Sequence, residues 1–101
     1  MSGITLINPA TELALQTVEH SSLEQVDDAV ADAVCAQRAW AALPPADRAA
    51  ALRRFAVAVD GDLENLAGLE VANSGHPVSQ ARWEAGHVRD VLNYYAAAPE
   101  R

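Results

Sequence analysis

One helical stretch in the second half of the chain carries two side chains with metal-binding spacing. Glu84 and His87 stand three residues apart, which is the Glu-x-x-His spacing that helical bundles use to hold a pair of metal ions. Those bundles need the pair twice, together with two further glutamates, whereas it occurs once here. His20 and His76 are not accompanied by residues that complete a ligand set. We therefore expect a solvent-exposed Glu–His pair, with a metal centre at Glu84 and His87 as the less favoured alternative.

Two other side chains could serve as a nucleophile or a base. Cys35 lies among alanines and valines, with the acidic Asp32 three residues before it, so we interpret it as a small apolar residue packed in the interior. Glu70 should be partly buried, because it shares a helix face with Leu63 and Leu66. We favour a structural ion pair for Glu70 over a catalytic role. The sequence leaves its partner open among the arginines Arg48, Arg53, Arg54 and Arg82.

Motifs that bind nucleotides or build hydrolase triads do not occur in this sequence. Its helical region has four glycines that stand singly and form neither G-x-G-x-x-G nor a P-loop: Gly61, Gly68, Gly75 and Gly86. No serine lies in a recognisable nucleophile turn. We therefore assign no catalytic residue and no cofactor-binding residue to this chain.

Charge and composition narrow the function classes further. Against 14 acidic residues the 101-residue chain has only seven lysines and arginines, which gives a formal net charge of −7. This excess of negative charge disfavours nucleic acid and anionic membranes as partners. No apolar run approaches the roughly 20 residues that span a bilayer, and no secretory signal is visible. The one cysteine allows no internal disulfide, so we expect a reduced, cytoplasmic setting.

The elements that must position these side chains are a hairpin and four helices. Residues 4–18 predict a β-hairpin with its turn at Pro9, and two strands alone need a further surface on which to lie. Residues 22–98 predict four helices. The first begins with a capping box, either Ser21 with Glu24 or Ser22 with Gln25.

Prolines and glycines set the later boundaries. Pro44 and Pro45 end the first helix and begin the second, and Asp60-Gly61-Asp62 separates the second helix from the third. Gly75 suits the left-handed position that ends the third helix, and Pro77 suits the first turn of the fourth. We expect the fourth helix to bury five large residues: Trp83, Val88, Val91, Leu92 and Tyr95. The fold class is thus mostly α with an N-terminal β-hairpin, in one segment over residues 1–101.

Six short stretches, in this order and spacing, resemble the N-terminal part of the aldehyde dehydrogenase superfamily. The clearest are Ile7-Asn8-Pro9-Ala10-Thr11-Glu12, similar to the family's I-N-P-A-T-E turn, and residues 70–77, similar to its E-T-L-D-T-G-K-P stretch. The others are residues 24–30, 43–48, 52–54 and 90–96. The resemblance implies part of an α/β enzyme that oxidises aldehydes to carboxylic acids with NAD or NADP and is cytosolic and oligomeric.

The resemblance also implies what lies outside the matched segment. The family's nucleophilic cysteine, its water-activating glutamate and its cofactor loops all lie beyond these stretches, so Cys35 is not the family's nucleophile. We therefore expect a chain that is truncated relative to the family, is inactive alone and binds no cofactor by itself. Its partner would be the remaining part of a dehydrogenase, or a second copy through exposed apolar faces.

One family site touches this segment. Some members hold a monovalent cation with backbone carbonyls before the N-P turn and with the aspartate of the L-D-T-G stretch. By resemblance these positions are Leu6, Ile7 and Asn73, and Asn73 offers an oxygen without the charge. His76 likewise stands where the family commonly has lysine.

A second class of function stays open. A small acidic helical protein could fold by itself and bind a protein partner. Such a module should bury its leucines, valines and tryptophans in a four-helix packing, whereas part of a larger enzyme should leave them uncovered.

Overall fold

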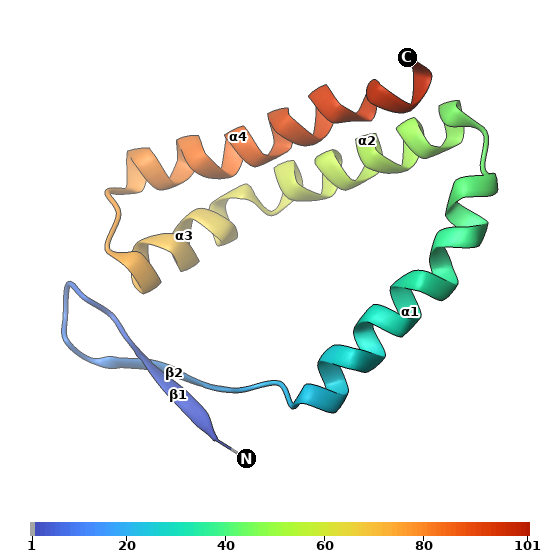
Figure 1. Cartoon of the computed structure of the whole chain (residues 1–101). Helices are drawn as coiled ribbons and strands as arrows, with labels where there is room; N and C mark the ends of the chain where they lie inside the picture. The colour runs from blue at the N-terminus through green and yellow to red at the C-terminus, as the bar shows by residue number, and fades with distance from the viewer. Residues whose placement is uncertain (1) are drawn as a thin grey trace.

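The computed structural model describes residues 2–101 as an antiparallel hairpin followed by helices (Figure 1). In chain order the elements are β1 (Gly3–Ile7), β2 (Ala14–Glu19), α1 (Leu23–Ala42), α2 (Pro45–Gly61), α3 (Leu63–Ser74), α4 (Val78–Ala96) and the short 3-10 helix η1 (Ala98–Glu100). The predicted fold class, mostly α with an N-terminal hairpin, is confirmed. The hairpin strands together extend one residue beyond the predicted range 4–18 at each end.

The hairpin turn is built by polar side chains and a tight backbone. Ile4 pairs with Val18 and Leu6 with Gln16, and the register shifts after Leu6. The side-chain oxygen of Asn8 accepts a hydrogen bond of 2.9 Å from the amide of Ala10, which stabilises the turn before the chain reverses.

The helix boundaries follow local chemistry. Ser22 caps α1: its hydroxyl accepts from the amide of Gln25 at 3.1 Å, and the Gln25 side chain accepts from the amide of Ser22 at 2.8 Å. This settles the capping box in favour of Ser22 and Gln25. Pro45 is the first residue of α2. Gly75 ends α3 with φ of 77°, the left-handed conformation that a residue without a Cβ adopts at no steric cost.

The packing is uneven along the chain. α4 lies against α2 and α3, while α1 extends away from them and packs extensively against no other described element (Figure 1). The radius of gyration is 17.5 Å. A compact domain of 100 residues has a radius of about 13 Å, so this chain is far more open than a self-contained domain.

The buried core consists of small side chains. Of residues 2–101, the buried apolar ones are Ala49, Ala56, Val59, Ala67, Ala81, Ala85 and Ala96. The expectation that α4 buries large residues is wrong for most of them: Trp83 is 60% exposed, Val88 52% and Tyr95 60%. α4 instead approaches its neighbours through Ala81, Ala85 and Gly86, whose small size lets the helix axes come close, and most of its bulky residues stay exposed.

Candidate functional site

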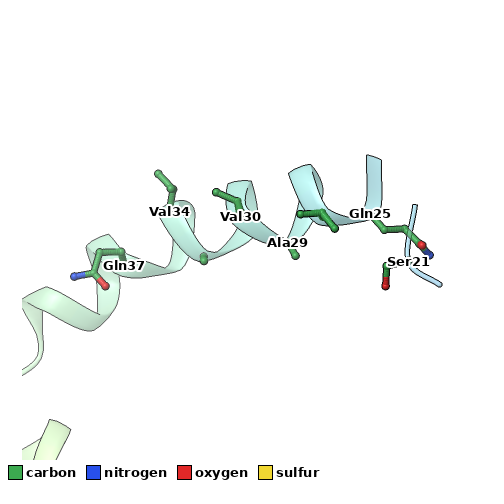
Figure 2. Close-up of a pocket in the computed structure, with 8 residues that line it drawn as sticks. Ser21, Gln25, Ala29, Val30, Val34 and Gln37 are labelled. Carbon is green, nitrogen blue, oxygen red and sulfur yellow. The ribbon is translucent and has the colours of Figure 1, made fainter. Parts of the chain in front are cut away.

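An uncovered apolar face on α1 is one of the main features of the surface. Its central residues are Val26, Val30 and Val34, spaced one helical turn apart and 50%, 60% and 63% exposed. Figure 2 shows Val30 and Val34 projecting to the same side, with Ser21 and Gln25 at one end and Gln37 at the other. Because all the lining residues come from α1 and the residue before its cap, this is an open face and not an enclosed cavity.

A second apolar surface is a groove of about 430 Å³ between α2, α3 and α4. Phe55, Leu66 and Val88 line it, and Glu70 and Glu84 are its charged lining residues. Phe55 is 58% exposed there. Burying a large apolar side chain completely contributes about 1.5–3 kcal/mol, so both surfaces leave considerable stabilisation unrealised in this chain.

Three polar side chains meet at the junction between α3 and α4. Nδ1 of His76 lies 3.0 Å from Oε2 of Glu84 and 3.5 Å from Oε1 of Glu70. One ring nitrogen of His76 and one carboxylate oxygen from each glutamate all lie within 4.8 Å of one another. The hydrogen bond from His76, with a second from Gln80, holds the pKa of the Glu84 carboxyl below its ordinary value. We call Glu70, His76 and Glu84 the Glu–His–Glu cluster.

The cluster corrects two expectations from the sequence. Glu84 does not pair with His87, whose ring instead stacks on Trp83 with centroids 5.0 Å apart. Glu70 is half-buried as expected, but its ionic partner is His76 and not an arginine. Two of the arginines considered for Glu70 bind other carboxylates: Arg82 binds Glu64, and Arg53 binds Glu100.

The sequence analysis found no ligand set around His76, because its partners Glu70 and Glu84 come from two different helices. The signal was available in Gly75, since a left-handed residue followed by proline reverses the chain and brings the start of α4 beside the end of α3. A histidine inside such a reversal meets carboxylates from both helices.

One ion-pair network ties α4 to α2. Arg89 donates to Asp60 on α2 at 2.6 Å and to its neighbour Asp90 at 2.8 Å. The hydrogen bond from Arg89 holds the pKa of Asp90 below its ordinary value, and the two carboxylates raise the pKa of Arg89. We interpret this network as structural, because it joins two helices and none of its members lines the apolar groove.

Comparison with known proteins decides the family. Residues 2–101 match the family model described as "Aldehyde dehydrogenase family". A probable betaine aldehyde dehydrogenase of Schizosaccharomyces pombe is 36% identical over 96% of this chain. The chain belongs to the aldehyde dehydrogenase family.

Solved aldehyde dehydrogenases contain the same fold. A NAD-dependent benzaldehyde dehydrogenase from Corynebacterium glutamicum superposes on 99% of this chain with a TM-score of 0.93 and 29% identity. Lactaldehyde dehydrogenase from Escherichia coli superposes on 100% of it with a TM-score of 0.94 and 28% identity. This chain covers 22% and 21% of those two chains, and 20% of the S. pombe relative. It therefore corresponds to an N-terminal part of the aldehyde dehydrogenase fold, about a fifth of the length of its relatives.

The positions assigned to the family's monovalent cation are partly brought together. Leu6 of β1 and Asn73 of α3 line one small groove, together with Leu69 and Glu70. Ile7 is not among the residues that line it and is 49% exposed. The cation site at Leu6, Ile7 and Asn73 stays a prediction.

Cys35 of this aldehyde dehydrogenase segment is exposed, so its interpretation as an interior residue is wrong. The reason is that α1, on which it lies, packs extensively against no other element among residues 2–101. Within residues 2–101 no helix combines the length and the apolar character needed to cross a lipid bilayer.

Proposed function

We propose that this chain is a structural segment of an enzyme that oxidises aldehydes to carboxylic acids with NAD. Its own role is to supply packing surface to the polypeptide that carries the thiol, the glutamate and the nucleotide loops. The observation that carries this proposal is the α1 face, where Val26, Val30 and Val34 stand exposed in a chain that matches the family model over residues 2–101.

NAD is the proposed coenzyme of the complete enzyme, ahead of NADP. Support comes from the C. glutamicum relative, which is named as NAD-dependent, and from the structure of PnpE, which is a complex with nicotinamide adenine dinucleotide. The chain by itself is proposed to bind no coenzyme and to have no dehydrogenase activity, since catalysis requires reacting groups held together in a fixed geometry. A cytoplasmic location is proposed from the single cysteine and the acidic composition.

The proposed partner is the remaining part of an aldehyde dehydrogenase. A second copy of this chain is the alternative occupant, but a net charge of −7 on each copy opposes self-association. An apolar face this exposed on a lone helix is typical of a surface that is covered in the assembled protein.

Complementation tests this proposal. E. coli lactaldehyde dehydrogenase lacking the segment that superposes on this chain is co-produced with the chain, and NADH formation from lactaldehyde is measured in the purified complex. We expect activity with the unchanged chain and its loss with Val30→Asp, which places a charge in the centre of the α1 face.

The matched control is Ala39→Asp. Ala39 lies nine residues along α1 from Val30, which is half a revolution about the helix axis, so it adds the same charge to the opposite face. We expect the Ala39→Asp chain to restore more activity than the Val30→Asp chain. Equal activity for the two variants, or none with the unchanged chain, would contradict the proposed role of the α1 face.

A further inference from the structure

We propose that Glu70, His76 and Glu84 form a binding site for a divalent transition-metal ion of the zinc type. The Glu–His–Glu cluster gathers its ligands from the end of α3, the connecting loop and the second turn of α4. The bound ion would link these three segments and stabilise their relative positions.

Two of the three separations between the ligand atoms match those around a metal ion. With bonds of about 2.0–2.2 Å, neighbouring ligand atoms lie about 3.0 Å apart in an octahedral site and about 3.4 Å apart in a tetrahedral site. The observed separations from Nδ1 of His76 are 3.0 Å to Glu84 and 3.5 Å to Glu70. The two carboxylate oxygens lie within 4.8 Å of each other, so adjustment of the Glu70 and Glu84 side chains would bring both onto one ion.

Ordinary hydrogen bonding accounts for only part of this arrangement. Nδ1 of an imidazole carries at most one hydrogen, and a good hydrogen bond directs it at one acceptor. Two carboxylate oxygens nevertheless converge on this one nitrogen. A metal ion bound to the nitrogen lone pair would satisfy His76, Glu70 and Glu84 at once, and its two positive charges would balance the two carboxylates.

Neighbouring residues hold the two carboxylates in place. The hydroxyl of Ser74 donates to Oε1 of Glu70 at 2.8 Å, and the side-chain amide of Gln80 donates to Oε1 of Glu84 at 3.3 Å. Outer partners of this kind orient ligands in known metal sites. The ligand side chains are 34–43% exposed, so an ion can reach them and water can complete the coordination.

The ligand chemistry selects the class of ion. Magnesium and calcium prefer oxygen ligands alone, whereas one imidazole nitrogen with two carboxylates suits zinc, cobalt and similar ions. Histidine is essential to this selection. A lysine at position 76 could keep ion pairs with both glutamates, but its protonated amine offers no lone pair to a metal.

Metal titration of the 101-residue chain tests the proposal. Co²⁺ is titrated first, because its visible absorption reports coordination by nitrogen and oxygen ligands, and Zn²⁺ is then used to displace it. We expect saturable binding of one ion per chain. We expect His76→Lys and Glu84→Gln to weaken Zn²⁺ binding at least about tenfold, since each removes or weakens a direct ligand.

The control is His87→Gln. It removes a histidine that lies on α4, as Glu84 does, but outside the cluster, so it should leave the affinity for Zn²⁺ unchanged. Bound Zn²⁺ should also slow amide hydrogen exchange at the α3–α4 junction in the unchanged chain and not in His76→Lys. No saturable binding by the unchanged chain would overturn the proposal. Equal affinity for the unchanged chain and His76→Lys would overturn it as well.

Discussion

Replacing Gly75 with alanine should loosen the junction between α3, α4 and the hairpin. Gly75 has φ of 77°, which disfavours any residue with a Cβ by about 1–2 kcal/mol. A Cβ at this position would also lie 2.9 Å from Cγ of Pro9 in the hairpin turn, closer than side-chain atoms pack. Overpacking of this kind typically costs about 1–3 kcal/mol. We expect a combined loss of about 2 kcal/mol or more.

Native-state amide hydrogen exchange measures this loss locally, without requiring the whole chain to unfold in one step. A loss of about 2 kcal/mol corresponds to exchange about 30-fold faster, since about 1.4 kcal/mol is a factor of ten. The affected amides should be those of the last turn of α3 and the first turn of α4. Replacing Pro9 with alanine in the Gly75→Ala chain should recover the steric part of the loss and leave the backbone part.

Gly68→Ala is the matched control. Gly68 lies inside α3, has no positive φ, and a Cβ there would meet nothing within 4 Å. Alanine at this helical position should stabilise α3 by up to about 1 kcal/mol. If Gly75→Ala exchanged as slowly as Gly68→Ala, the assignment of Gly75 to a strained and crowded position would be wrong.

Two further predictions concern the helix cap and the ion pairs. Ser22→Ala should destabilise α1 by about 0.5–2 kcal/mol, because it removes the side chain that caps the Gln25 amide. Ser21→Ala should destabilise α1 less, because Ser21 lies outside the capping box. Circular dichroism compares the helix content of the two variants, and equal losses would contradict the cap assignment. Asp90→Asn should destabilise α4 near neutral pH because Arg89 lowers the pKa of Asp90. Since the folded pKa is the lower one, the charged form stabilises the fold above the ordinary pKa, and this contribution is lost as pH falls through the folded pKa. Thermal melts from neutral pH down to about pH 2 should therefore show the wild-type advantage shrinking below about pH 4, and an advantage constant over that range would contradict the role of Asp90.

Local signals were enough to predict the order and type of the elements. The capping pair of Ser22 and Gln25, the proline at the start of α2 and the left-handed Gly75 each act over a few residues, so the sequence displays them directly. The hairpin prediction rested likewise on the turn at Pro9.

The direction in which large side chains point could not be predicted in the same way. Trp83 and Tyr95 of α4 have the character of core residues, and the sequence alone favours burying them. In the structure the alanine face of α4 meets α2 and α3, so most of the bulky residues of α4 stay exposed. The Glu–His–Glu cluster was missed for a related reason, since its members meet only after the chain reverses at Gly75.

We propose that another part of an aldehyde dehydrogenase covers the apolar face of α1. Hydrogen exchange on the 101-residue chain, resolved by peptide mass spectrometry, tests it most directly. Most of the stability of a helix in a protein comes from tertiary packing, and α1 has no buried residue, so its amides should exchange faster than those of α2 and α4. Protection of α1 equal to that of α4 in a monomeric sample would contradict this proposal, because it would show that this chain buries the α1 face by itself.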